Sequence, residues 1–104
     1  MRKYHNKPTV VDGIKFDSKA EARRYNELKL LVRACEISDL QLQPKFPLVV
    51  NGELVCTYIA DFSYEMRFHR IVEDVKSPAS KTPQYRIKVK LLKALTGIEI
   101  REVA

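Results

Sequence analysis

The sequence lacks any long apolar run. No stretch approaches the roughly 20 apolar residues that a membrane-spanning helix needs, and residues Met1–His5 contain no apolar segment of the kind found in a secretory signal. There are only two cysteines, Cys35 and Cys56, and their spacing is not that of a zinc site. We therefore expect a cytoplasmic protein whose thiols are buried and reduced.

Acidic residues are missing from two parts of the chain. Residues 1–11 and 76–98 hold no Asp or Glu, and their basic residues are Arg2, Lys3, Lys7, Lys76, Lys81, Arg86, Lys88, Lys90 and Lys93. The net charge of +6 favours a polyanionic partner. A basic segment of this kind is expected on a surface that follows a phosphate backbone. A solvated helix face explains it equally well, so charge alone leaves both interpretations open.

The chain of 104 residues is expected to form one small domain with a single core. Residues 1–16 are predicted to form an extended arm or a short hairpin that turns at Asp12-Gly13. The segment Ser18–Glu21 has the form of a capping box, which predicts a helix from Ser18 to about Ala34. The stripe of this helix that faces the core is predicted to be Glu21, Tyr25, Leu28, Val32 and Cys35.

Three antiparallel strands, a second helix and a last strand are predicted to follow. Asn51-Gly52 is the residue pair that two-residue hairpin turns favour. The predicted bounds are Leu40–Val50 with an interruption at Pro44, Leu54–Tyr64, Ile71–Lys76, a helix over residues 84–96 and a strand over Ile98–Val103. The last strand follows a helical crossover and can therefore pair in parallel. We thus expect an α/β fold in which helices flank a mixed central sheet.

Strand alternation decides which carboxylates can act together. Residues two apart on a strand share a face, so Asp74 and Lys76 lie together and Glu73 points the other way. If a hairpin brings Asp61 beside Asp74, their oxygens and the backbone carbonyl of Val75 form a site suited to Mg²⁺ or Mn²⁺. The Lys76 amine would then orient or help deprotonate a water that attacks a phosphodiester. The alternative is a charged pair that discourages aggregation at a sheet edge.

Several phrases of the sequence resemble a known family. They are Val11–Ser18, Leu42–Phe46, Tyr58–Phe62 and Val72–Lys76. An acid at the start of the first helix, followed by Ala60-Asp61 and Asp74-Val75-Lys76, resembles the PD-(D/E)XK nuclease superfamily. The phrases extend over most of residues 3–103 and look like a small phage-associated family within it. The pattern is also similar to Holliday-junction resolvases and to the endonuclease subunit of certain transposons.

The resemblance implies a restriction-endonuclease-like αβββαβ core and Mg²⁺-dependent hydrolysis of phosphodiester bonds. It implies that Asp61 and Asp74 bind the metal, that Lys76 is the lysine of the motif and that Glu21 is the helix carboxylate. A capping glutamate needs no such role. Glu73 would replace Asp74 as the motif acid if a bulge displaced the strand. Ala60 departs from the motif, which has proline at this position.

Further polar side chains are predicted to contact DNA or to lie beside the site, with ordinary surface polarity as the alternative. They are Gln43, Lys45, Lys81, Tyr85 and Lys88. His5 and His69 lack partners at the spacing of metal ligands.

The favoured hypothesis is a metal-dependent DNA endonuclease that acts on branched DNA such as Holliday junctions. We expect a homodimer encoded by a phage or prophage and active in the cytoplasm of a bacterial host. The alternatives are a non-catalytic nucleic-acid-binding module of phage origin and a structural phage protein whose acids and lysine form salt bridges. A binding module has no need of two acids beside a phosphate path, because they would repel it, and this favours the nuclease.

Overall fold

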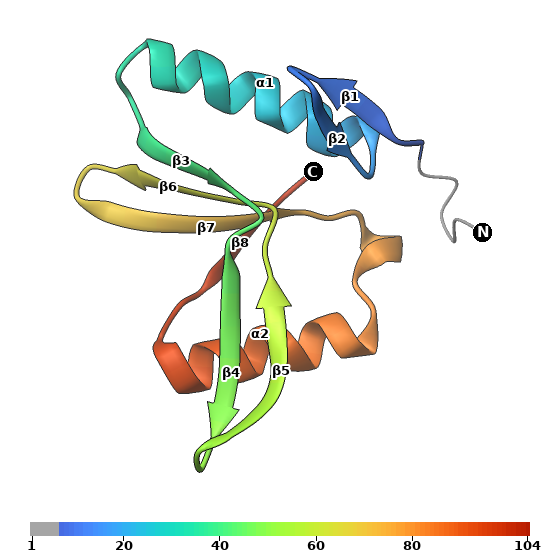
Figure 1. The fold of residues 1–104 in the computed structure, drawn as a ribbon, viewed down its shortest axis with the longest axis vertical. Helices are drawn as coiled ribbons and strands as arrows, with labels where there is room; N and C mark the ends of the chain where they lie inside the picture. Colours follow the sequence, from blue (N-terminus) through green and yellow to red (C-terminus); the bar gives the residue numbers. More distant parts are fainter. Residues whose placement is uncertain (1–6) are drawn as a thin grey trace.

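Two α-helices lie on opposite sides of a mixed sheet in the computed structural model, which describes residues 7–104 (Figure 1). In chain order the elements are β1 Thr9–Val11, β2 Ile14–Phe16, α1 Lys19–Arg33, β3 Ser38–Leu42, β4 Lys45–Val50, β5 Glu53–Ile59, β6 Phe62–Met66, β7 His69–Val75, the 3₁₀ turn η1 Pro78–Ser80, α2 Pro83–Thr96 and β8 Ile100–Val103. The fold is therefore a small mixed α/β domain. Arg2, Lys3 and the rest of the predicted arm up to residue 6 lie outside the described residues.

The β1–β2 hairpin precedes α1 and packs against it. Its turn is the predicted Asp12-Gly13, with φ of 52° and 75°, as a two-residue hairpin turn requires. The predicted hairpin is therefore confirmed over its described residues. Ser18 caps α1, because its Oγ accepts a hydrogen bond of 3.1 Å from the amide of Glu21.

The predicted core stripe of α1 is correct only in its middle. Tyr25 and Leu28 are buried, and Ala22 is buried as well. Val32 is 37% exposed and Cys35 is exposed, so the prediction of two buried thiols is wrong for Cys35, while Cys56 is half-buried. The reason is that α1 ends at Arg33, after which the chain turns away through a left-handed conformation at Cys35.

The main sheet has the strand order β3-β6-β7-β8. The pairs β3–β6 and β6–β7 are antiparallel, whereas β7 and β8 are parallel. This confirms that the strand after the second helix pairs in parallel, as the helical crossover predicts. A second, two-stranded sheet is formed by β4 and β5, and its turn is the predicted Asn51-Gly52 with φ of 51° and 82°.

Two long strands predicted from the sequence are each broken into two. The first breaks at Gln43, which has φ of 50°, and at Pro44, which has no N–H for a ladder bond. The second breaks at Ala60 and Asp61. Two hydrogen bonds bridge the breaks, from Gln43 N to Asp61 O at 3.0 Å and from Ala60 N to Pro44 O at 3.1 Å. The paired strands therefore form one bent hairpin, whose outer half, β4–β5, packs against α2 (Figure 1).

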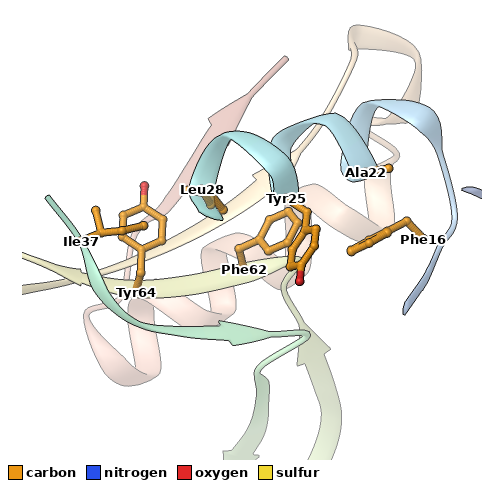
Figure 2. Packing of buried hydrophobic residues seen from close by; sticks show 7 residues of the cluster. All are labelled: Phe16, Ala22, Tyr25, Leu28, Ile37, Phe62 and Tyr64. Atoms are coloured by element: carbon orange, nitrogen blue, oxygen red, sulfur yellow. The ribbon is translucent and has the colours of Figure 1, made fainter. Parts of the chain in front are cut away.

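The hydrophobic side chains form one cluster on each side of the sheet. The cluster beneath α1 consists of Phe16, Ala22, Tyr25, Leu28, Ile37, Phe62 and Tyr64 (Figure 2). The cluster between α2, β4–β5 and the other face of the sheet consists of Leu48, Tyr58, Ala60, Val72, Tyr85 and Leu92. Because both faces of β7 are covered, polar side chains near its end are forced into the interior.

The second helix begins and ends close to the predicted positions. Thr82 caps its N-terminus, and Gly97, with φ of 79°, ends it in the left-handed conformation that glycine favours. Tyr85 and Leu92 are buried, whereas Leu95 near its end is 41% exposed. The final strand starts at Ile100, later than predicted. Neither helix within residues 7–104 is long and apolar enough to cross a membrane.

Candidate functional site

Asp61 and Asp74 lie together where the bend of the hairpin meets the end of β7. The register pairs Phe62 with Glu73, which sets Asp61 beside Asp74 on the neighbouring strand. The amide of Asp61 donates to Asp74 Oδ1 at 2.8 Å, and the amide of Val75 donates to Asp61 Oδ2 at 2.8 Å. Each carboxylate is therefore fixed by the backbone beside the other one.

A tyrosine fixes the second oxygen of Asp74. The hydroxyl of Tyr58 on β5 donates to Asp74 Oδ2. Asp74 is only 3% exposed, and burial raises its pKa, against the lowering effects of the Asp61 amide and of Lys76. Burial raises the pKa of Asp61 for the same reason. Lys76 is the positive charge that lowers the pKa of both aspartates against this effect of burial.

Glu21 on α1 faces the same site. Its pKa is raised to about 7, mainly by burial and then by the negative charges of Asp61 and Asp17, while Lys76 lowers it. Among the hydrogen bonds of the described residues, only the serine half of the capping box forms at α1. A hydrogen bond from the backbone of Asp17 also lowers the pKa of Glu21, so its role in the site stays a prediction.

Lys76 follows directly after β7 on the face that carries Asp74. Its amide donates to the carbonyl of Val103 at 2.8 Å, which extends the parallel ladder by one bond. Its Nζ lies 4.5 Å from the centroid of the Tyr85 ring. Both the backbone and the ammonium group of Lys76 are therefore held by the C-terminal part of the chain.

The four predicted catalytic residues each line at least one of three cavities. One of about 580 Å³ is bordered by Glu21 and Lys76 together with the N-terminal end of α1. A second, of about 270 Å³, is bordered by Asp74 and Lys76. A third, of about 80 Å³, is bordered by Glu21 and Asp61. Glu21 borders the first and third cavities, and Lys76 borders the first and second.

Glu73 lies on the opposite face of β7 and is fully buried. Its Oε1 accepts from Arg24 Nε at 2.7 Å, and its Oε2 accepts from Arg24 Nη2 at 3.0 Å and from Tyr64 Oη at 2.8 Å. The β6–β7 pairing is regular through Glu73, so no bulge turns it toward Asp74. Alternation therefore holds, and Glu73 forms an ion pair beneath α1.

The predicted DNA contacts are in different surroundings. Gln43 and Lys45 are exposed, and Gln43 borders the cavity shared by Glu21 and Asp61. Lys88 borders the cavity shared by Asp74 and Lys76. Lys81 and Tyr85 instead bind one carboxylate from β8: Lys81 Nζ lies 3.0 Å from Glu102 Oε1, and Tyr85 Oη donates to Glu102 Oε2 at 2.8 Å.

Three residues around the site were missed by the sequence analysis. Tyr58 binds Asp74, Arg24 binds Glu73, and Glu102 binds Tyr85. The order of strands in the sheet decides these contacts, and no local pattern marks them. The sequence points only to Tyr58, which lies three residues before Asp61 within the segment Tyr58–Phe62 that resembles the nuclease family.

The donor set around Asp61 and Asp74 suits a hard divalent cation in its chemistry. Carboxylate oxygens are the ligands that Mg²⁺ and Mn²⁺ prefer, and burial has raised the pKa of Asp61, Asp74 and Glu21, which a cation would reverse. Within residues 7–104, no three acidic, histidine or cysteine side chains are grouped closely enough to hold a metal ion in their present positions. Ligation by Asp74 would also share or replace the hydrogen bond from Tyr58.

The fold and the site define a small mixed α/β domain with buried carboxylates and a lysine at the end of its central strand. The chain belongs to the family described as "Protein of unknown function (DUF1064)", which it matches over residues 1–101. Comparisons with curated proteins and with solved structures give no match.

Proposed function

We propose that this protein is a metal-dependent DNA endonuclease with a PD-(D/E)XK-type site on a restriction-endonuclease-like core. The observation that carries the proposal is that backbone amides hold the carboxylates of Asp61 and Asp74 on neighbouring strands: the Asp61 amide donates to Asp74, and the Val75 amide donates to Asp61. Each carboxylate is fixed by a backbone amide beside the other, and Lys76 lies on the same face. In this assignment α1, the bent hairpin, β7, α2 and β8 correspond to the αβββαβ order.

The proposed roles follow from the positions of the side chains. Asp61 and Asp74, with the Val75 carbonyl and Glu21, would hold Mg²⁺ or Mn²⁺. A bound divalent ion supplies positive charge that polarises the scissile phosphate and makes a water more acidic at neutral pH. Lys76 would orient the attacking water and stabilise the negative charge that develops on the phosphate.

Basic side chains around the cavities support a phosphate-containing substrate. Lys7 and Lys19 border the same cavity as Glu21, and Lys88 borders the cavity of Asp74. These lysines would attract the DNA backbone, whereas the carboxylates would repel it until a cation neutralises them. This combination favours a site that binds DNA and metal together.

The substrate and assembly belong to the same proposal. A chain of 104 residues has few loops with which to read a base sequence, so recognition of branched DNA is the favoured mode. A homodimer would cut paired strands at a junction symmetrically. A phage or prophage origin and action in the bacterial cytoplasm fit this assignment.

The test is cleavage of labelled four-way junction, linear duplex and single-stranded DNA in Mg²⁺, Mn²⁺ or EDTA. We expect wild-type protein to cut the junction in either metal and not in EDTA. Asp74→Asn and Lys76→Ala should each lower the cleavage rate at least about 100-fold, because each removes a group that stabilises charge in the transition state. Lys76→Ala should still bind the junction.

The matched controls are Asp39→Asn and Lys90→Ala. Asp39 is an exposed aspartate paired with Arg70 away from the site, and Lys90 is an exposed lysine of α2. Both variants should cut like wild type. The proposal is falsified if wild-type protein cuts none of the substrates in either metal, or if Asp74→Asn cuts as fast as wild type.

One observation favours a second candidate, a nucleic-acid-binding module without catalysis. Both oxygens of Asp74 already accept hydrogen bonds, from the Asp61 amide and from Tyr58. Such a module would bind DNA equally well in EDTA and in Mg²⁺ and would cut none of the substrates. Tight metal-independent binding without cleavage would therefore select this candidate.

A further inference from the structure

Lys76 is held against an aromatic ring by a short chain of contacts. Its Nζ lies 4.5 Å from the centroid of the Tyr85 ring, within the range of a cation–π interaction. The Tyr85 hydroxyl donates to Glu102 at 2.8 Å, and Glu102 pairs with Lys81 at 3.0 Å. The face of the Tyr85 ring therefore contacts the Lys76 ammonium group, while the Tyr85 hydroxyl binds Glu102.

The ring of Tyr85 is itself rigidly placed. Tyr85 is 9% exposed and packs in the cluster between α2 and the sheet, where its ring centroid lies 6.4 Å from that of Tyr58. Its amide donates to the capping oxygen of Thr82 at 3.1 Å, which fixes the first turn of α2 at this position. The ring is thus held by the helix cap, the core and Glu102 together.

From these contacts we propose that Tyr85 is a positioning residue for Lys76. Its ring face restrains the flexible four-carbon side chain so that the ammonium group stays beside Asp74, and its hydroxyl does not contact DNA. This inference rests on the proposed function for its effect on cleavage. The contact between the ring and the ammonium group is a separate physical claim.

Two substitutions separate the ring from the hydroxyl. Tyr85→Phe keeps the aromatic face and removes the bond to Glu102, whereas Tyr85→Leu removes both. We expect Tyr85→Leu to lower kcat for the junction about three- to thirty-fold, the range that a lost cation–π contact gives. Tyr85→Phe should stay within about threefold of wild type, and both variants should keep the wild-type Kd for junction DNA in EDTA.

Tyr25 provides a matched control on the other side of the sheet. It is also a buried helical tyrosine, 8% exposed, whose hydroxyl donates to a carboxylate, Asp12, at 3.0 Å. Lys29 Nζ lies 5.5 Å from the centroid of its ring. Tyr25→Leu therefore imposes a similar loss of core packing, and we expect its kcat to stay at the wild-type value.

A spectroscopic measurement tests the contact without relying on cleavage. In NMR spectra recorded in EDTA, the ε-methylene protons of Lys76 should be shifted upfield by the Tyr85 ring in wild type and in Tyr85→Phe. They should return to an ordinary lysine position in Tyr85→Leu and stay shifted in Tyr25→Leu. This result would support the proposal even if wild-type protein cut no DNA, an outcome that would reject the proposed function alone.

Three results would overturn the proposal. The first is an ordinary chemical shift for Lys76 in wild type. The second is a Tyr85→Leu variant with wild-type kcat in an active enzyme. The third is a loss of DNA affinity in Tyr85→Phe with kcat unchanged, which would make the hydroxyl a DNA contact instead.

Discussion

Glu73 and Asp74 are adjacent and carry the same charge, yet they lie in opposite surroundings. Glu73 is neutralised by two hydrogen bonds from Arg24, whereas Asp74 accepts from a neutral hydroxyl and a backbone amide. A buried ion pair contributes to stability only while both partners are present. A buried carboxylate without a cation costs free energy that function can justify. The two residues should therefore respond to mutation in opposite ways.

Glu73→Gln should lower the free energy of unfolding by about 1–3 kcal/mol, because it leaves the half-buried Arg24 guanidinium with only the exposed Glu27 carboxylate as a charged partner. Asp74→Asn removes a carboxylate whose pKa burial has raised, and it should be at least as stable as wild type in EDTA. Urea denaturation of wild type and both variants measures these differences in the free energy of unfolding. Equal losses of stability would contradict separate roles for the two acids.

Glu21 should make stability depend on pH. Its pKa is about 7 in the folded protein and 4.5 as its ordinary value, so the protonated group contributes stability that is present below pH 4.5 and lost as the pH rises through 7. Glu21→Gln should remove this slope. After allowance for screening by solvent, wild type should lose about 1 kcal/mol relative to the variant across this range.

The measurement is urea denaturation in EDTA at pH 4.5 and pH 8. Glu36→Gln, an exposed carboxylate after the end of α1, is the control and should follow the wild-type slope. Adding Mg²⁺ at pH 8 should raise the stability of wild type more than that of Glu21→Gln, since a ligand that binds only the folded state stabilises it. If the free energy of unfolding changed with pH equally in wild type and in Glu21→Gln, a raised pKa of Glu21 would be excluded.

The sequence predicted the residues of the candidate site more fully than their partners. Alternation alone separated Asp74 and Lys76 from Glu73, because neighbouring residues on a strand point to opposite faces. Tyr58 and Arg24 could not be predicted in the same way. Arg24 and Glu73 are 49 residues apart, and only the packing of α1 on the sheet brings them into contact.

At the scale of elements, the bent hairpin creates the site. Asp61 lies in the break between β5 and β6, where its amide donates both to the carbonyl of Glu73 at 3.2 Å and to Asp74 Oδ1 at 2.8 Å. The sequence predicted the first of the two breaks, since Pro44 interrupts the predicted first strand. It gave no sign of the break at Ala60, where the pattern reads as a continuous strand. Proline lacks an N–H, so the break at Pro44 can be predicted from the sequence. The break at Ala60 and Asp61 lies opposite it on the paired strand, and no local residue type predicts it.

Ala60→Pro should destabilise the protein, although the motif that the sequence resembles has proline at this position. The amide of Ala60 donates to Pro44 at 3.1 Å, and proline has no N–H with which to make this bond. Ala60 is also fully buried. We expect a loss of about 1–3 kcal/mol in the free energy of unfolding, the cost of leaving the Pro44 carbonyl without its donor.

Ala60→Gly is the control for this substitution, because it keeps the N–H and loses only a methyl group. Glycine should cost about 0.5–1 kcal/mol through chain entropy. Urea denaturation of the two variants isolates the hydrogen bond. A proline variant as stable as the glycine variant would mean that the Ala60 bond contributes little to the bend.

At the scale of the whole molecule, the charge distribution is clearer in the folded protein than in the sequence. The acid-free segment from Lys76 to Ile98 starts directly after β7 and contains the turn η1 and all of α2. Its lysines separate into groups. Lys81 and Lys93 pair with carboxylates of the C-terminal residues, whereas Lys88 borders the candidate site. Only part of the basic segment is therefore placed to follow a phosphate backbone.

DNA binding should weaken steeply with salt, because each neutralised phosphate releases counterions. Lys88→Ala should reduce the slope of log K against log salt concentration by about 1 unit. Lys90→Ala, on an exposed part of the same helix, should leave the slope unchanged. Fluorescence anisotropy with labelled junction DNA across a salt series measures both. A salt-independent affinity would argue against an electrostatic DNA surface.

The sequence by itself determined the features that depend on a few neighbouring residues. The Ser18 cap of α1, the turns at Asp12-Gly13 and Asn51-Gly52 and the opposite faces of Glu73 and Asp74 follow from local backbone geometry. Only the tertiary structure decided the register that joins Asp61 to Asp74, and the ring that meets Lys76. These contacts join distant segments, so their geometry depends on how the whole core packs.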